Sequence, residues 1–185
     1  MSSPRMTKFV ALLRAVNLGG PTQVSMAELR QMSEKMGFSD IQTLLQSGNL
    51  VFTAGRESPA SLEDRLESES NKMFGRPLEV FVRSEPEWRG VVEANPFPEE
   101  AVRDPGHLLV TVLKAAPSPA AWSALEAAIQ GRERIRGVGR HAYIVYPDGV
   151  GRSRLTAVVI EKHLGTRGTS RNWNTVSKIH QLLGG

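Results

Sequence analysis

The sequence predicts an α+β protein made of two linked ferredoxin-like (split βαβ) modules, each an antiparallel sheet with helices on one face. Stretches of strand and helix spacing follow one another as strand, helix, strand, strand, helix, strand. The same order restarts after a stretch rich in proline and acidic residues, which is typical of a linker. We therefore expect modules at 1–95 and 107–185, a linker at 96–106, and an extra C-terminal helix.

The first module is supported by specific start and stop signals. Ser25 followed by Glu28 is a capping box, and Gly37 is placed to end the helix. Pro59 suits a first helical position, where its missing N–H needs no partner. The expected elements are a buried strand at 8–16, a helix at 25–37, strands at 41–46 and 50–54, a helix at 59–74, a strand at 77–83 and a helix from 84. The acidic residues of the second helix have the spacing of a solvated face, namely Glu63, Asp64, Glu67 and Glu69.

The second module repeats the pattern without clear sequence identity to the first. Its expected elements are a strand at 107–113, a helix from 118, a hairpin of strands at 133–138 and 141–146, a helix after 153, an edge strand at 168–170 and a helix at 172–183. Ser153 is expected to cap the helix that carries Leu155, Val158 and Val159.

Composition excludes several classes of chemistry. The 185 residues include no cysteine, so disulfides, thiol nucleophiles and zinc–thiolate sites are excluded, which suits a reducing cytoplasm. No apolar run is long enough to span a bilayer, and the N-terminal segment lacks the apolar core of a signal peptide. The four histidines are scattered, with no metal-ligand spacing. We expect a cytoplasmic protein with no cofactor, no metal and no membrane partner.

The positive charge is concentrated in the C-terminal third. Residues 1–131 hold 13 Lys and Arg against 16 Asp and Glu, a balance of −3. Residues 132–185 hold ten Lys and Arg against three Asp and Glu, a balance of +7. This asymmetry indicates an anionic partner for the C-terminal module, although a solvated basic face that aids solubility has the same composition.

Polar residues and glycines follow the first predicted strand and fill the turn after the second. In a split βαβ unit these two strands run parallel, so their carboxyl ends share one edge of the sheet. We expect one polar cluster there, formed by Arg14, Asn17, Gly19, Gly20, Gln46, Ser47 and Asn49. It fits a polar ligand site in which glycine lets backbone N–H groups approach an anion. The alternative is that Asn17 and Asn49 bond to their own turns.

A second cluster lies at the predicted starts of the last two helices. The topology places both helix starts on one edge of the second sheet, and a helix N-terminus offers free N–H donors. Guanidinium groups bind phosphate oxygens in a fork. The candidate anion-binding residues are Arg152, Ser153, Arg154, Arg171 and Asn172. The alternative is that Asp148 pairs locally with the arginines and Ser153 only caps its helix.

Four blocks of sequence resemble the bacterial proteins grouped as domain-of-unknown-function family 1697. The blocks are LLRAVNLGG, VSMAELRQMSEKMGFSDIQTLLQSGNLVF, YPDGVGRSRL and TSRNWNTVSKI, in the family's order and across nearly the whole chain. The resemblance implies two linked ferredoxin-like modules and no established activity. Its signature positions here are Arg14, Asn17, Gly19, Gly20, Gln46 to Asn49, Gly151 to Ser153 and Arg171 to Thr175. The lysine-containing stretch that often follows the two glycines is replaced by Pro21-Thr22-Gln23.

Three functions remain open on this sequence. The first is non-catalytic binding of a phosphate-bearing partner, such as nucleic acid, through the basic C-terminal module. The second is an enzyme acting on a small phosphorylated or carboxylated substrate, with Ser153, the arginines and Asp148 as candidates. The third is a protein-interaction module that pairs sheet edges between chains. A deep pocket at that edge of the second sheet, containing a carboxylate within hydrogen-bond reach of Ser153, would favour the second. The sequence leaves the oligomeric state open.

Overall fold

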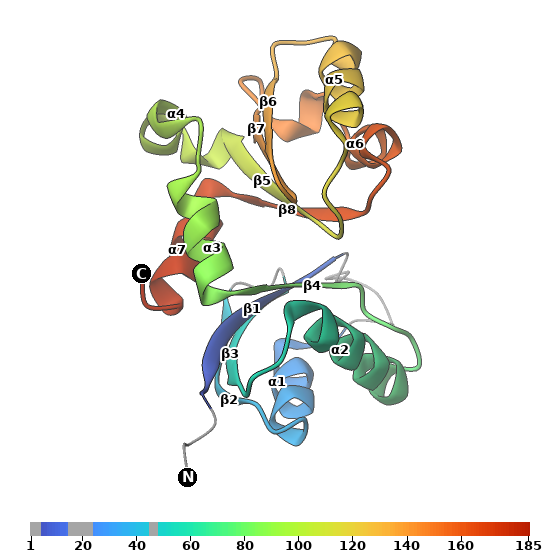
Figure 1. Ribbon diagram of the computed structural model, residues 1–185, viewed down its shortest axis with the longest axis vertical. Helices are drawn as coiled ribbons and strands as arrows, with labels where there is room; N and C mark the ends of the chain where they lie inside the picture. Colours follow the sequence, from blue (N-terminus) through green and yellow to red (C-terminus); the bar gives the residue numbers. More distant parts are fainter. Residues whose placement is uncertain (1–4, 15–23, 45–47) are drawn as a thin grey trace. The chain divides into compact units, whose positions relative to one another are not determined.

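The computed structural model of the chain describes residues 5–14, 24–44 and 48–185, and it confirms the α+β fold (Figure 1). The chain divides into two units. The first unit is Met1–Arg89 together with Ile179–Gly185, and the second is Gly90–Lys178. Helices α3 (Glu85–Glu93) and α7 (Trp173–Leu182) each contribute residues to both units.

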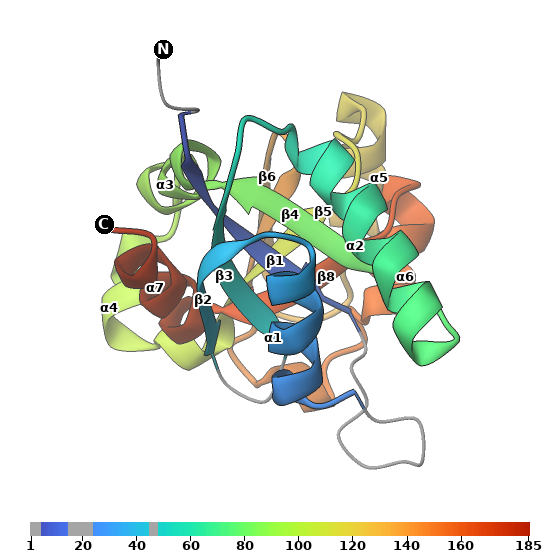
Figure 2. The same ribbon diagram turned by 90° about the horizontal axis from the view of Figure 1, so that it is seen from below.

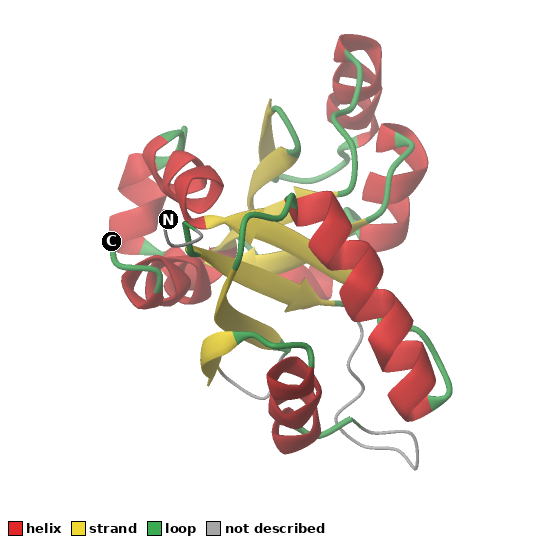
Figure 3. Cartoon of the chain, turned by 60° about the horizontal axis from the view of Figure 1, so that its bottom comes forward, coloured by secondary structure: helices red, strands yellow, loops and turns green. Residues whose placement is uncertain are grey.

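The first unit is a four-stranded antiparallel sheet with helices on one face. Its elements are β1 (Thr7–Leu13), α1 (Met26–Lys35), β2 (Ser39–Leu44), β3 (Asn49–Ala54), α2 (Pro59–Phe74) and β4 (Val80–Ser84). The strand order is β2-β3-β1-β4, and every pair is antiparallel, as the split βαβ pattern predicts. Figures 2 and 3 show α1 and α2 on the same face of this sheet.

Local signals in the sequence explain where the helices of the first unit begin. The Ser25 hydroxyl accepts a bond from Glu28 N–H at 3.1 Å, and the Glu28 carboxylate accepts one from Ser25 N–H at 2.8 Å. Both bonds of the predicted capping box are therefore present. Pro59 is the first residue of α2, as predicted, and Gly75 ends that helix in a left-handed conformation with φ 72°.

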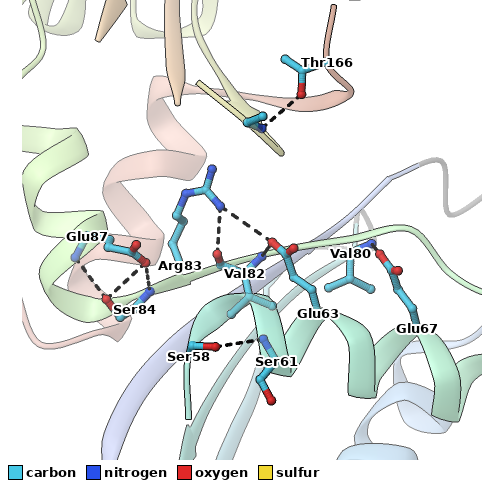
Figure 4. A network of polar contacts seen from close by, with 11 residues as sticks. Ser58, Ser61, Glu63, Glu67, Val80, Val82, Arg83, Ser84, Glu87 and Thr166 are labelled. Atoms are coloured by element: carbon cyan, nitrogen blue, oxygen red, sulfur yellow. Dashed lines mark hydrogen bonds and ion pairs between the residues drawn. The ribbon is translucent and has the colours of Figure 1, made fainter. Parts of the chain in front are cut away.

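Polar side chains of α2 bond to the outer edge of strand β4 (Figure 4). The three bonds run from the N–H groups of Leu78, Val80 and Val82 to Ser70, Glu67 and Glu63, at 2.8, 3.1 and 2.9 Å. From Val80 to Val82 the strand advances about 6.7 Å, and from Glu63 to Glu67 the helix advances about 6 Å, so these two spacings match. The prediction of a solvated acidic face is therefore wrong for Glu63 and Glu67, because their carboxylates satisfy an otherwise unpaired strand edge.

The second unit repeats this architecture. Its elements are β5 (Leu108–Leu113), α5 (Pro119–Ala128), β6 (Arg134–Val138), β7 (His141–Val145), α6 (Ala157–Leu164) and β8 (Gly168–Asn172), followed by α7. The strand order is β6-β7-β5-β8, which is the order of the first unit. Edge strand β8 is bonded in the same way, since Glu161 on α6 accepts a bond from Gly168 N–H at 3.2 Å.

The segment between the two repeats contains helical structure. Helix α4 (Pro98–Arg103) is followed by a single 3-10 turn at Pro105–His107. Asn95 begins this structure by accepting a bond from Phe97 N–H at 2.9 Å. Glu100 forms an ion pair with Arg134, which joins α4 to the edge strand β6.

Candidate functional site

The end of β1 lies beside the turn that precedes β3, as the topology predicts. Leu13 N–H donates to the Gly48 carbonyl at 2.8 Å. Arg14 follows at the end of the strand, where its guanidinium lies 3.6 Å from the Glu79 carboxylate. The described residues Arg14 and Gly48, from the two parts of the predicted polar cluster, therefore lie at the same end of the sheet.

The described members of this cluster take part in local structure. Asn49 is fully buried, and its side-chain amide donates to the Leu44 carbonyl at 3.1 Å, across the turn between β2 and β3. This is the turn-bonding alternative for Asn49. Five members of the cluster lie outside the described residues, namely Asn17, Gly19, Gly20, Gln46 and Ser47.

A depression of about 260 Å³ in the second unit collects three of the predicted anion-binding residues. We call it the arginine depression. It lies between the segment before β6 and the loop after β7, and its lining residues are Gln130, Gly131, Glu133, Asp148, Arg152, Ser153 and Arg154. Residues separated by about twenty positions in the sequence thus form one site.

The loop that carries Ser153 is held at several points. Its first part turns at Gly149, whose φ of 83° favours glycine. A short 3-10 helix, Val150–Arg152, follows directly. At the far end, the buried Tyr146 hydroxyl donates to the Leu155 carbonyl at 3.0 Å. Burial, together with the charge of Glu133, raises the pKa of Tyr146 to about 12, so this hydroxyl remains a donor at neutral pH.

Ser153 forms a hydroxyl–carboxylate pair inside the depression. Its Oγ donates to Glu133 Oε1 at 2.5 Å and accepts a bond from Leu155 N–H at 3.0 Å. The prediction that Ser153 caps the next helix is wrong. Helix α6 begins later, at Ala157, and its N-cap is Thr156, whose side chain accepts from Val159 N–H. The Ser153 hydroxyl bonds instead within its own loop, so the depression does not lie at a helix N-terminus.

The two arginines of the depression differ from the neighbouring Arg132 in having no carboxylate as an ion-pair partner among the described residues. Arg154 donates to the neutral Gln130 side chain at 2.9 Å. Among the described residues, neither Arg152 nor Arg154 forms an ion pair with a carboxylate. Asp148 is paired with Arg132 instead, and that hydrogen bond and charge, with a further contribution from Arg152, hold its pKa below the usual range. Both arginine side chains are exposed, so their guanidinium groups face solvent.

Arg171 and Asn172 lie outside the arginine depression. Arg171 is on β8, where its Nη1 donates to Thr169 Oγ1 at 2.8 Å and to the Ser170 carbonyl at 2.9 Å. Burial lowers the pKa of Arg171 to about 10. The Asn172 side chain accepts a bond from Thr175 N–H at 3.1 Å, as expected for a residue at the start of α7. Strand order explains the separation, because β6 and β8 are the two opposite edges of the sheet.

Two residues that line the depression, Gln130 and Glu133, were not among those predicted from the sequence. Gln130 accepts a hydrogen bond from Arg154, and Glu133 accepts one from the Ser153 hydroxyl. The segment GRERIR, 131–136, was available as a signal, because it alternates charge just before an edge strand. Because most of this segment was assigned to a hairpin strand, it was not considered as part of a site.

The fold and the depression define a class of protein with two ferredoxin-like modules, the second of which carries exposed arginines. Residues 6–143 match the family model described as "Protein of unknown function (DUF1697)", and the chain therefore belongs to that family, as the sequence blocks predict. No curated protein matches the chain. The family has no established activity to assign.

A solved structure has the same architecture. The conserved bacterial protein SP0830 from Streptococcus pneumoniae is 22% identical, and the match covers 97% of this chain and 99% of that one with a TM-score of 0.77. At this identity the likeness supports the fold alone.

Metal-ligand clusters and membrane-spanning helices are both absent from the described part of the chain. Across residues 5–14, 24–44 and 48–185, no group of three or more His, Cys, Asp or Glu side chains could hold a metal ion. No helix in those ranges has the length and apolar composition required to cross a membrane.

Proposed function

We propose that the protein binds a phosphate-bearing partner through the arginine depression. The observation that carries this proposal is the pair of exposed guanidinium groups, Arg152 and Arg154, neither of which forms an ion pair with a carboxylate of the described chain. Each guanidinium can offer two parallel N–H donors to phosphate oxygens. Of the two acids of the depression, Asp148 is paired with Arg132, which reduces its repulsion of an anion, and Glu133 accepts a hydrogen bond from Ser153.

Nucleic acid is the partner class that we propose. Residues 132–185 carry a balance of +7, and Arg132, Arg134 and Arg136 follow from the depression to the edge strand, where they form exposed ion pairs with Asp148, Glu100 and Glu126 for which a polyanion would compete. A polyanion can contact such a row at successive phosphates, whereas a single phosphate ester would occupy the depression alone. The cytoplasmic location expected from the absence of cysteine suits this partner.

The double variant Arg152→Gln/Arg154→Gln tests this proposal. We expect its affinity for a fluorescently labelled single-stranded oligonucleotide to fall by about tenfold or more, since hydrogen bonds to charged groups are lost. The dependence of log affinity on log salt concentration should also flatten by about one unit per arginine removed. Fluorescence anisotropy at low and moderate salt measures both quantities, with duplex DNA as a second probe.

Arg103→Gln is the matched control, because Arg103 is an exposed arginine of the same unit that does not line the depression. It should bind nearly as the wild type does. The proposal is contradicted if the wild type shows no binding at low salt, or if the double variant and the control behave alike.

A second candidate function is an enzyme that acts on a small phosphorylated substrate. It is favoured by one observation, the 2.5 Å bond from the Ser153 hydroxyl to Glu133 inside the depression. A serine that attacks phosphorus must lose its proton, and Glu133 is placed to accept it, while Arg152 and Arg154 offset the charge of the phosphoryl oxygens.

Ser153→Ala separates this second function from simple binding. If the protein is a phosphotransfer enzyme, the wild type releases p-nitrophenolate from p-nitrophenyl phosphate, and the variant falls to the background rate. Oligonucleotide affinity should stay within about twofold, because no charge is removed. Absence of release by the wild type, or equal release by the variant, would exclude Ser153 as a nucleophile toward this substrate.

A further inference from the structure

The first unit contains a separate depression of about 540 Å³ that is rich in positive charge. Its lining includes Arg5, Lys8 and Arg56, with Met6 and Pro86 as apolar members and Glu85 as the acid. We call it the N-terminal depression. All of these residues belong to the first unit, so this site is independent of the arginine depression.

Strand pairing explains why these residues meet. Lys8 lies at the start of β1 and Arg5 just before the strand, whose first residue Thr7 is paired with Ala54 at the end of β3. Because β1 and β3 are antiparallel, Arg56 emerges just beyond that pair, at the same end of the sheet. The pairing of Phe9 with Ser84 brings the end of β4, and with it Glu85, to this position.

The charges of the N-terminal depression are not balanced locally. In the portion of the chain that the structure describes, Arg5, Lys8 and Arg56 form no ion pair with a carboxylate. The single acid, Glu85, lies 3.6 Å from Arg89 and is thereby engaged. Over the whole first unit, Lys and Arg equal Asp and Glu at 11 each, so this is a local concentration of charge rather than a general excess. Neighbouring like charges repel, and an anion placed among them relieves the repulsion.

The apolar members indicate that the ligand carries more than a phosphate group. Met6 is 50% exposed, which leaves a flexible and polarisable thioether at the rim. Pro86 adds a rigid apolar surface and is also exposed. The volume falls within the range of roughly 300–1,000 Å³ that is typical of small-molecule sites.

We propose that the N-terminal depression binds a small phosphorylated molecule of nucleotide size, with its phosphate among Arg5, Lys8 and Arg56 and its apolar or aromatic body against Met6 and Pro86. Binding here adds a small-molecule ligand to the first unit and does not depend on the function proposed for the second. The experiment uses adenosine monophosphate as the probe, because it combines a dianionic phosphate with an aromatic body.

Titration of the full-length protein with adenosine monophosphate, followed by ¹H–¹⁵N NMR, should shift the backbone amides of Thr7, Lys8 and Arg56. The variant Lys8→Gln/Arg56→Gln should bind at least tenfold more weakly. The wild type should bind adenosine, which lacks the phosphate, at least tenfold more weakly than adenosine monophosphate. It should also bind inorganic phosphate more weakly than the nucleotide. Both substituted side chains are exposed, so circular dichroism should show an unchanged fold.

Arg152→Gln/Arg154→Gln serves as the control, because it removes two arginines from the other depression. It should leave the adenosine monophosphate affinity and the shifted amides unchanged. The inference is overturned if the wild type shows no shifts at millimolar nucleotide, if Lys8→Gln/Arg56→Gln binds as the wild type does, or if the shifts map to the arginine depression. Because the control variant separates the two sites, failure here leaves the oligonucleotide proposal standing.

Discussion

Replacement of Glu63 by leucine is expected to lower the free energy of unfolding of the first unit by about 3 kcal/mol. Two lost interactions contribute to this decrease in stability. The Val82 N–H loses its acceptor, and a buried donor without a partner costs about 1–3 kcal/mol. The guanidinium of Arg83, which is fully buried, also loses the carboxylate that lies 3.9 Å away, although its bond to the Val82 carbonyl remains.

Hydrogen exchange and urea unfolding measure this effect. In Glu63→Leu, the amide of Val82 should exchange much faster than in the wild type, and the urea midpoint should fall. Glu63→Gln keeps an acceptor for Val82 but removes the charge beside Arg83, so its loss should be intermediate. Asp64→Asn, at the neighbouring exposed position of α2, should change stability by no more than about 0.5 kcal/mol. Equal stability of Glu63→Leu and Asp64→Asn would refute the role assigned to this carboxylate.

The order of elements could be predicted because each depends on local chemistry. The capping residues Ser25 and Glu28, the proline at position 59 and the apolar runs of the strands all act within a few residues of one another. The role of Glu63 and Glu67 could not be predicted in this way. Their partners are Val82 and Val80, 19 and 13 residues away, and the bonds exist only because α2 packs along an edge strand.

The candidate site was predicted in part, for a similar reason. The sequence identified Arg152, Ser153 and Arg154 from the composition of their loop, and the structure places all three around one depression. It did not identify Glu133, which reaches Ser153 across 20 positions. Arg171 was grouped with these residues because the starts of two helices were expected at one edge. The later start of α6 and the position of β8 at the far edge of the sheet separate it from them.

Replacement of Gly137 by alanine is expected to destabilise the second unit by about 2 kcal/mol, within the range found for overpacked sites. A Cβ on Gly137 would lie 2.3 Å from Cε2 of the Trp122 ring, far inside contact distance. Gly137 is not among the described glycines with positive φ, so its backbone would accept any residue. The requirement for glycine on this edge strand is therefore steric and comes from the indole of α5, which packs directly over the strand.

A double-mutant cycle with Trp122 tests this explanation. Once the ring is removed by Trp122→Ala, adding a methyl group at Gly137 should cost less than about 0.5 kcal/mol, so the coupling between the two positions should be about 1.5 kcal/mol or more. Gly106→Ala is the control, because a Cβ there has no neighbour within 4 Å. Urea unfolding of the four proteins in the cycle gives the coupling directly. If Gly137→Ala costs the same with and without the indole, the cost must come from the backbone of β6. The contact would then not explain why this strand carries a glycine.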